Sequence, residues 1–352
     1  MKSILFVLNA GVGGAERMTV LYAKLLHQQG YDCKLAIIKS RQKGFAIKPF
    51  IGNDLKYDII DCRFDKLVFL YLTLYLIKNK FDIVFSSLSY LNNIVLWCKT
   101  KGIHKGKVVI RMNTMPSRLS DSRIKNCKKL FPHADAIISQ TEEMKQEMIS
   151  IYGLSEESIT VINNPIDETY IAECLKETFD FDKNYTNYVA VGRVNPIKDY
   201  KTLLSAFVMV REKQPNSRLY IIGDLASEEQ MQVYYDFLKK NNAQEFVFFE
   251  GFQRNPYKYL NGCDAYVLSS IKEGLPNALL EAMYLNKPVI STRCLPFVEQ
   301  VIKEGENGFS IPVGNAVAMA EAMLRGVSIK SPKPSQCLTN SKNTLLEIFD
   351  FL

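Results

Sequence analysis

Short apolar runs alternate with amphipathic stretches along most of the chain. The first run, Ile4–Leu8, precedes a stretch from about Ala15 to Gln28 in which apolar residues recur at helical spacing. Further runs lie at 33–39, 83–85, 108–110 and 136–138, and again at 188–191, 219–222, 247–249, 265–268 and 289–291. Short, nearly continuous apolar runs are typical of strands buried in parallel sheets. The pattern therefore predicts an α/β protein with two doubly wound parallel sheets, one in each half of the chain.

The second half contains an expected strand, loop, helix and strand, with two carboxylates around the helix start. Glu273 lies on the loop after the strand 265–268, Pro276 suits the first turn of the helix, and Lys287-Pro288 follows its end. A helix N-terminus behind a glycine-bearing loop presents backbone N–H groups to a phosphate. Glu281 lies ~7.5 Å along the axis from Pro276. The two glutamates would suit hydroxyl groups on either side of a diphosphate, although two solvated glutamates are the simpler alternative.

Four segments resemble the retaining glycosyltransferases of family GT4, which have the GT-B fold. They are Gly13-Gly14-Ala15-Glu16-Arg17, Val161–Asp167, Val191–Asp199, and Glu273–Glu281, which resembles the family's E-x7-E motif. The resemblance runs from residue 4 to about 313. It implies two Rossmann-like domains facing a central cleft, with an N-terminal acceptor-side domain at 1–166, a linker at 167–186 and a C-terminal donor domain at 187–336. It also implies a C-terminal helix, at about 338–352, that crosses back to the first domain.

The resemblance also implies the roles of individual residues. It makes Arg193, Lys198 and Glu273 the catalytic residues. Donor binding is assigned to Gly13, Gly14, Arg193, Lys198, Phe252, Arg254, Glu273, Gly274, Leu275, Pro276, Asn277 and Glu281. Fixed cations on a loop after a strand can stabilise the charge of a departing diphosphate. We therefore expect no metal and no other cofactor, with a nucleotide sugar, expected to be a UDP-sugar, as co-substrate.

The first half departs from the family pattern after the strand at 108–110. Many relatives carry a His or Asp there, whereas this chain has Arg111-Met112-Asn113-Thr114. No general base is therefore named. Same-side displacement, in which the leaving phosphate oxygen accepts the proton of the acceptor, needs none. We expect Arg111, Asn113 and Arg118 on the acceptor side.

Composition is that of an intracellular globular protein with two domains. The chain has 352 residues, 47% of them apolar, and eight cysteines without any C-x-x-C pair, which argues against a zinc site or a disulfide scaffold. Met1-Lys2-Ser3 runs directly into the first strand, so we expect no signal peptide and a cytoplasmic protein. The apolar run Leu67–Ile77 is too short to span a membrane.

Positive charge is concentrated in the first half. Residues 1–166 carry 24 lysines and arginines against 14 acidic residues, a net charge of +10, whereas residues 167–352 carry 20 against 23, a net charge of −3. The stretch Arg118–Lys129 is especially basic, and no nucleic-acid-binding signature accompanies it. A lipid diphosphate or an anionic inner-membrane surface is the favoured partner of this stretch, and a solvated basic face is the alternative.

For the expected apolar helix at 64–80, ordinary core packing is favoured over a membrane-touching face.

The sequence thus predicts a metal-independent, retaining hexosyltransferase. The sugar would move to a saccharide acceptor, expected to be a lipid-linked intermediate of a surface polysaccharide such as lipopolysaccharide or capsule, or of a glycan. Two alternatives remain. A nucleotide-sugar epimerase on the same scaffold would need no acceptor, and a non-catalytic nucleotide-sugar binding protein would be expected to lose Arg193, Lys198 or Glu281.

Overall fold

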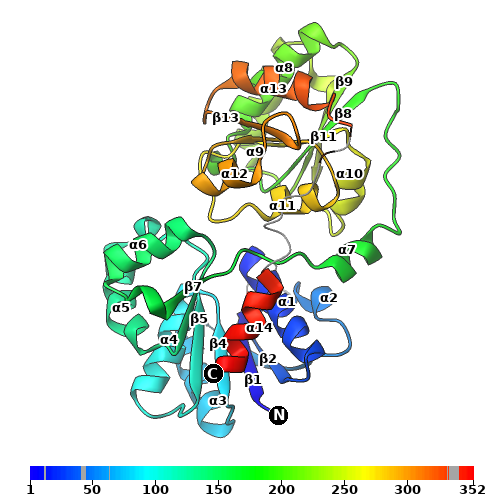
Figure 1. The fold of residues 1–352 in the computed structure, drawn as a ribbon. Coiled ribbons are helices and arrows are strands. Elements are labelled where there is room, and N and C mark those ends of the chain that lie inside the picture. The colour runs from blue at the N-terminus through cyan, green and yellow to red at the C-terminus, as the bar shows by residue number, and fades with distance from the viewer. Residues whose placement is uncertain (12, 41–44, 63, 331, 333–340) are drawn as a thin grey trace. The chain divides into compact units, whose positions relative to one another are not determined.

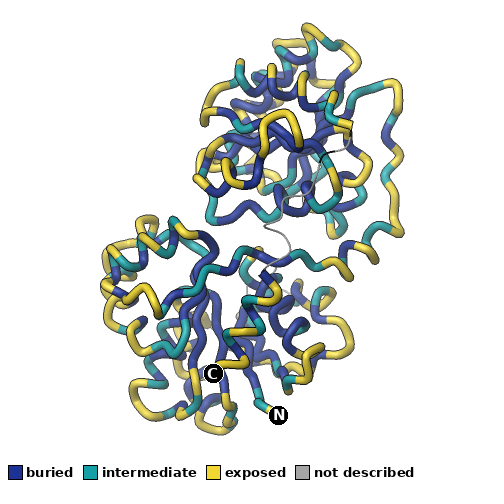
Figure 2. Tube along the Cα trace, viewed as in Figure 1, coloured by how far each residue is buried: buried dark blue, intermediate teal, exposed yellow. Residues whose placement is uncertain are grey.

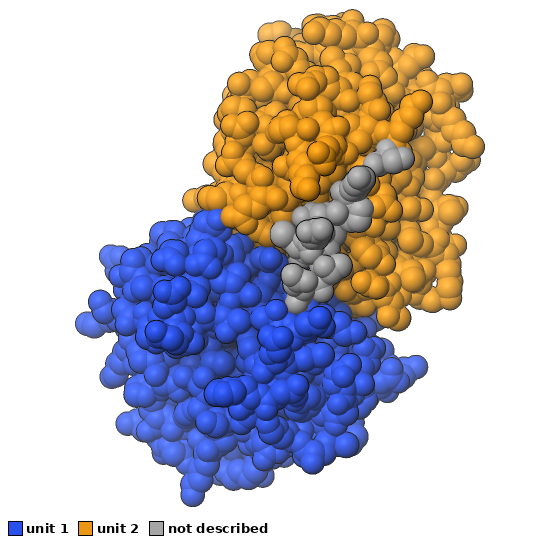
Figure 3. Space-filling model, viewed as in Figure 1, with its two compact units in different colours: residues 1–165, 339–352 blue, residues 166–338 orange. Residues whose placement is uncertain are grey.

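Two units make up the computed structural model, which describes residues 1–11, 13–40, 45–62, 64–330, 332 and 341–352 (Figure 1). The first unit comprises Met1–Pro165 and Thr339–Leu352, and the second comprises Ile166–Leu338 (Figure 3). Each unit contains one parallel sheet with helices on both faces. The predicted α/β class with two doubly wound parallel sheets is therefore confirmed.

The first unit has a sheet of seven strands in the order β3-β2-β1-β4-β5-β6-β7. The strands are β1 (Ser3–Asn9), β2 (Asp32–Ser40), β3 (Lys56–Cys62), β4 (Ile83–Ser86), β5 (Lys107–Arg111), β6 (Ala136–Ser139) and β7 (Ile159–Val161). The helices are α1 (Gly14–Gln28), α2 (Lys48–Ile51), α3 (Val68–Lys78), α4 (Ser89–Thr100), α5 (Asp121–Leu130), α6 (Glu142–Tyr152) and α14 (Ser341–Phe351).

Successive strand residues in this sheet face opposite layers, as the two-residue period of a strand requires. Leu5 and Val7 of β1 pack with the helices α3, α4, α5 and α6, whereas Ile4 and Phe6 pack with α1 and α14. Both faces of the sheet are therefore covered, and the central strands are buried along their length (Figure 2). This arrangement explains why these strands appear in the sequence as short, nearly continuous apolar runs.

The C-terminal helix α14 lies with the first unit. Leu345 and Phe349 are buried in the same layer as α1, and the rings of Phe349 and Phe85 are 6.4 Å apart between centroids. Lys2 Nζ donates to the carbonyl of Phe349 at 3.4 Å. Residues 338–340, which the sequence prediction included in this helix, lie outside the described residues.

The second unit has a sheet of six parallel strands in the order β10-β9-β8-β11-β12-β13. The strands are β8 (Thr186–Val191), β9 (Ser217–Ile222), β10 (Val247–Gly251), β11 (Ala265–Leu268), β12 (Val289–Thr292) and β13 (Gly308–Ile311). The helices are α7 (Glu168–Cys174), α8 (Tyr200–Lys213), α9 (Glu228–Lys240), α10 (Tyr257–Gly262), α11 (Asn277–Tyr284), α12 (Pro296–Val301) and α13 (Ala316–Gly326).

The stretch 167–186 differs from the loose linker that the sequence suggested. It contains helix α7, and Ile171 and Phe181 are buried in the core of the second unit. Phe181 contacts the rings of Tyr220 and Phe179 at 4.9 and 4.7 Å between centroids. Apolar burial holds this segment against the second sheet, so it is part of that unit.

The order of strands reverses at one point in each sheet. In the first sheet the reversal lies between β1 and β4, and in the second it lies between β8 and β11. In open parallel sheets, ligands bind outside the carboxyl ends of the strands at such a point. A ligand site in the second unit is therefore expected at the loops after β8 and β11.

Candidate active site

The loop after β8 holds Lys198 in a defined position. Asn195 accepts a hydrogen bond from the backbone N–H of Lys198 at 3.1 Å, which starts a single turn of 3₁₀ helix at Pro196–Lys198. Asp199 follows with φ of 47° and caps α8 by accepting from the N–H of Thr202 at 3.3 Å. Two consecutive caps therefore fix the backbone on either side of Lys198.

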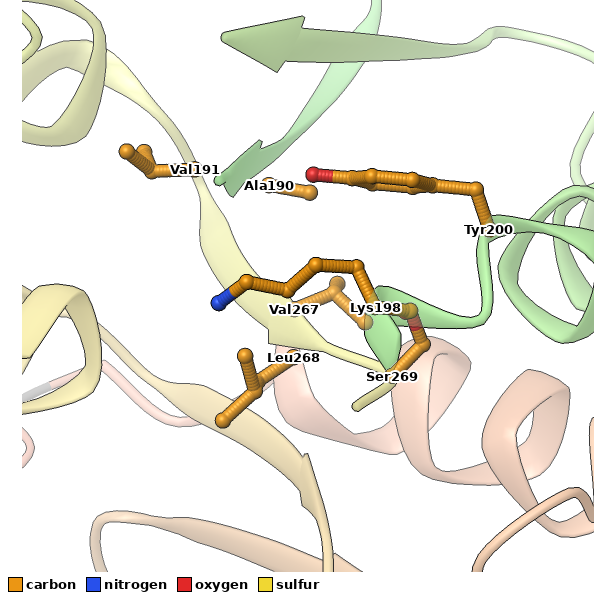
Figure 4. A pocket seen from close by; sticks show the side chains of 7 residues that line it. All are labelled: Ala190, Val191, Lys198, Tyr200, Val267, Leu268 and Ser269. Atoms are coloured by element: carbon orange, nitrogen blue, oxygen red, sulfur yellow. The ribbon is translucent and has the colours of Figure 1, made fainter. Parts of the chain in front are cut away.

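Lys198 and Glu273 meet, although they are 75 residues apart in the chain. Lys198 Nζ lies 2.7 Å from Glu273 Oε1, and Ser270 Oγ donates to the same oxygen at 2.7 Å. The two charged side chains are 20% and 16% exposed. Figure 4 shows the lysine chain extended alongside the ring of Tyr200 in a small pocket. The structure thus brings together one cation and one carboxylate at the reversal point of the second sheet.

Two glycines allow the close approach of the loops after β8 and β9. Tyr200 donates its hydroxyl to the carbonyl of Gly192 at 2.8 Å. A Cβ on Gly192 would lie 2.7 Å from Lys198 Cε, and a Cβ on Gly223 would lie 2.2 Å from the Gly192 carbonyl oxygen. Gly223 also has φ of +150°. The contact at Gly223 is with backbone, so only glycine fits there.

Helix α11 begins one residue later than predicted. Pro276 precedes the first helical residue, Asn277, as the N-cap, and no side chain caps this end among the described residues. Glu281, on the same helix, is 6% exposed and accepts a hydrogen bond from Tyr257 Oη at 2.9 Å. Leu275 and Pro276 are buried, and Gly274 is half-buried. The loop is thus anchored by its apolar residues at the start of the helix.

Three further residues of the predicted donor site lie on loops that follow the carboxyl ends of strands in the second sheet. Arg193 follows β8, and Phe252 and Arg254 follow β10. All three side chains are exposed, Phe252 by 56%. Within the described ranges neither arginine side chain has a protein partner. Both guanidinium groups are therefore available to a ligand.

In the first unit, Gly13 is the N-cap of α1 and Gly14 its first residue. A Cβ on Gly13 would lie 2.6 Å from Glu16 Oε2, so the glutamate carboxylate folds back over this turn. The hydroxyls of Thr19 and Ser87 are 2.6 Å apart and tie α1 to the loop after β4. The glycine turn therefore lies at the reversal point of the first sheet.

Arg111 was expected on the acceptor side, but the structure buries it inside the first unit, so it is not available to an acceptor. Its side chain is 1% exposed, donates to Asn164 Oδ1, and has its guanidinium carbon 5.6 Å from the centre of the Tyr22 ring. The reason is the strand period, because Arg111 faces the α1 layer together with Val109. Asn113 is half-buried, and Arg118 is exposed in the 3₁₀ turn Pro116–Arg118.

The sequence contains one Asp-x-Asp string, Asp180-Phe181-Asp182, the type of string that can hold a metal in some glycosyltransferases. Phe181 is buried, and Asp182 pairs with Arg218 Nη1 at 3.3 Å and accepts from the N–H of Asn184 at 3.0 Å. These contacts give Phe181 and Asp182 a structural role within the second unit. In the described part of the chain, no three His, Cys, Asp or Glu side chains gather as metal ligands would.

Two family models match the chain. The model described as Glycosyltransferase Family 4 matches residues 12–170, and the one described as Glycosyl transferases group 1 matches residues 173–344. The chain therefore belongs to this family of GT-B glycosyltransferases.

Among its relatives, an uncharacterized glycosyltransferase of Methanocaldococcus jannaschii is 33% identical over 174 residues, which is 47% of this chain and 42% of that protein. A second relative, from Campylobacter jejuni, is N-acetylgalactosamine-N,N'-diacetylbacillosaminyl-diphospho-undecaprenol 4-alpha-N-acetylgalactosaminyltransferase. It is 23% identical over 372 residues, covering 98% of this chain and 95% of that protein. Among solved structures, Anabaena HepE in complex with UDP and glucose superposes with a TM-score of 0.80 at 17% identity, covering 100% of both chains.

Helices in the described ranges reach at most the 15 residues of α1. No helix there has the length and apolar character that crossing a bilayer requires.

Proposed function

We propose that this glycosyltransferase moves a sugar from a UDP-sugar to a saccharide acceptor with retention of configuration and without a metal. The observation that carries the proposal is the Lys198–Glu273 pair at the carboxyl ends of β8 and β11, beside the start of α11. Relatives with bound UDP or UDP-glucose support the choice of donor.

The chemistry follows from where charge develops. As the bond between the sugar and the diphosphate breaks, negative charge grows on the departing oxygen, and preorganised donors that bind this charge lower the barrier. Lys198 and the exposed Arg193 supply two cations. The N-terminal N–H groups of α11 would add to them. In the proposed same-side displacement, the acceptor hydroxyl attacks the anomeric carbon and its proton passes to that departing phosphate oxygen.

Each remaining donor residue has a proposed contact. Glu281, held by Tyr257, would accept hydrogen bonds from the ribose hydroxyls, and Glu273 would accept from hydroxyls of the transferred sugar. Phe252 and Arg254, both exposed on the loop after β10, would contact the nucleobase. In this proposal the second unit holds the nucleotide, the first presents the acceptor, and the Gly13-Gly14 turn approaches the phosphates.

The acceptor is proposed to be carried on a lipid diphosphate, in the assembly of a surface polysaccharide or glycan at the inner face of the cytoplasmic membrane. The Campylobacter jejuni relative is named for a diphospho-undecaprenol acceptor. Other relatives are named for capsular polysaccharide and lipopolysaccharide core biosynthesis. The exposed Arg118, Arg123, Lys125, Lys128 and Lys129 fit an anionic acceptor.

A donor screen tests the proposal. Thermal unfolding would be followed with UDP, GDP and ADP and their sugars, since a ligand at a hundred times its dissociation constant adds ~2.7 kcal/mol of stability. We expect stabilisation by UDP and its sugars, transfer in the presence of EDTA, and a product with the anomeric configuration of the donor. Stabilisation by another nucleotide only, loss of transfer in EDTA, or an inverted product would each contradict the corresponding part.

A further inference from the structure

Helix α3 is apolar on its outer face as well as on its inner face. Its inner side chains, which include Val68, Leu72 and Leu76, are buried in the core of the first unit. The outer face of α3, defined here as Phe69, Leu70, Tyr71, Leu74 and Ile77, is exposed by 43%, 51%, 39%, 44% and 48%. Core packing was the favoured interpretation of this helix from the sequence, and it is correct for the inner face only.

These exposed side chains form one surface and are not scattered. Leu70, Leu74 and Ile77 follow the i, i+4, i+7 spacing that lines one side of a helix. Phe69 extends the surface toward α4, where its ring lies 4.7 Å from the half-buried ring of Trp97. Phe64, 55% exposed, precedes the helix. A contiguous apolar surface of this kind on a protein marks an interaction site.

Lysines lie at both ends of this surface. Helix α3 contains no acidic residue, and Lys66 precedes it while Lys78 and Lys80 lie at and beyond its end. Asp65 is the acidic residue next to Lys66. Lysines at the ends of an apolar helix can keep their ammonium groups at a polar interface while their stems lie along the apolar surface.

The same layer of helices continues with a basic surface. Helix α4 contacts both α3 and α5, and all three pack on one face of the first sheet (Figure 1). Arg123, Lys125, Lys128 and Lys129 of α5 are exposed, and within the described residues none of them forms an ion pair. A second copy of this chain would bring the same cations to the interface and repel them, whereas an anionic lipid surface is complementary.

We propose that the outer face of α3 inserts into the interfacial region of an anionic membrane, with α5 contributing electrostatic attraction. An 11-residue helix is ~16 Å long, against the ~30 Å of a hydrocarbon core, so the helix lies in the plane of the interface. The proposal deepens the lipid-linked acceptor proposed above and rests on it for its biological purpose. The binding itself can be measured without donor or acceptor.

Trp97 makes the test specific, because it is the one tryptophan of the chain and touches the outer face. The full-length protein would be mixed with phosphatidylcholine vesicles containing about 30% phosphatidylglycerol, and then with vesicles whose acyl chains carry bromine. We expect the protein to float with the vesicles, the Trp97 emission to shift to shorter wavelength, and bromine to quench it.

The test variant is Leu70→Gln/Leu74→Gln/Ile77→Gln, and the matched control is Val233→Gln/Tyr235→Gln/Val317→Gln on the second unit, where the three side chains are 60%, 44% and 57% exposed. The α3 variant should bind vesicles at least about tenfold more weakly, because three apolar side chains no longer enter the interface. The control should bind as the parent does. UDP affinity should be unchanged in both variants, which separates loss of the membrane surface from failure of the proposed function.

Each of the following results with the parent protein or the α3 variant would overturn the proposal. The parent protein does not bind these vesicles, or the α3 variant binds them as tightly as the parent, or the variant changes only the oligomeric state, which would identify a second copy as the occupant. A third variant, Arg123→Gln/Lys125→Gln/Lys128→Gln, should weaken binding and its dependence on salt but leave bromine quenching of the remaining bound protein. If the α5 variant lost all binding while the α3 variant bound normally, binding would be purely electrostatic, and insertion of α3 would likewise be excluded.

Discussion

Substitutions of Lys198 and Glu273 should have opposite effects on UDP affinity. In the unliganded protein the lysine ammonium is shared with a carboxylate at 2.7 Å. In the proposed reaction the same ammonium must also bind the diphosphate of the donor. Removing the lysine therefore removes a ligand contact, whereas removing the charge of Glu273 removes a competitor for that lysine.

The magnitudes follow from the kind of contact that is lost. A hydrogen bond to a charged group contributes ~1.5–3 kcal/mol, so Lys198→Met should weaken UDP binding roughly 10- to 150-fold. Glu273→Gln should leave UDP affinity unchanged or raise it several-fold. Both variants should lower kcat/KM by roughly 10²–10³-fold, the range for loss of one preorganised group that acts in the transition state.

Titration calorimetry with UDP and steady-state kinetics with the preferred donor measure these effects. Lys201→Met is the matched control, because Lys201 is an exposed lysine on the first turn of α8 and makes no ion pair among the described residues. Folding should be little affected, with ~1 kcal/mol lost in Lys198→Met, since Glu273 keeps its hydrogen bond from Ser270. Normal turnover in Lys198→Met, or equal loss of UDP affinity in both variants, would refute the reasoning.

Three further predictions concern single contacts. Gly223→Ala should destabilise the protein by at least ~2 kcal/mol in urea unfolding, because its Cβ meets backbone at 2.2 Å, whereas Gly251→Ala, with positive φ but open space, should cost ~1 kcal/mol. Tyr257→Phe should weaken UDP binding ~3- to 10-fold in calorimetry, because Glu281 loses its hydroxyl partner, without a comparable loss of kcat. Burial raises the pKa of Asp135, but hydrogen bonds from Lys99 and a backbone N–H outweigh it and leave that pKa lowered. The stabilisation by the Asp135 carboxylate is therefore present above the ordinary aspartate pKa of ~3.9 and is lost as pH falls through the lower pKa of the folded protein. Asp135→Asn should therefore lower the free energy of unfolding at neutral pH and make that free energy depend less on pH in acid.

Buried central strands were predictable from the sequence because they are apolar on both faces. The strands that the sequence pattern missed are at or near sheet edges or very short. Edge strand β3 reads Lys-Tyr-Asp-Ile-Ile-Asp-Cys and has four exposed residues, of which Lys56 and Asp61 are charged, and β7 has three residues. Strand β13 begins with Gly308, whose Cβ would lie 2.0 Å from the carbonyl oxygen of Val289. A glycine required by a neighbouring backbone looks like a turn signal until that neighbour is known.

Two errors at the level of side chains have a common cause. Arg111 was expected on the acceptor side because it follows the strand at 108–110, where many relatives carry a His or Asp, and the outer face of α3 was expected in the core because of its apolar character. The strand period places Arg111 on the same face as Val109, where the ring of Tyr22 and the amide of Asn164 enclose it. Residue type indicates what a side chain can do, but the face on which it lies depends on which layers the fold supplies.

The strand order alone does not explain why the charged pair belongs to the second unit. Both sheets reverse at one point, so both bring the loops after two neighbouring strands together. In the first sheet hydroxyls occupy that point, where Thr19 meets Ser87 at 2.6 Å. In the second sheet the equivalent loops carry Lys198 and Glu273. The topology can be inferred from the apolar pattern alone, but only the residues near each reversal point distinguish the one with the Lys198–Glu273 pair from the one with the two hydroxyls.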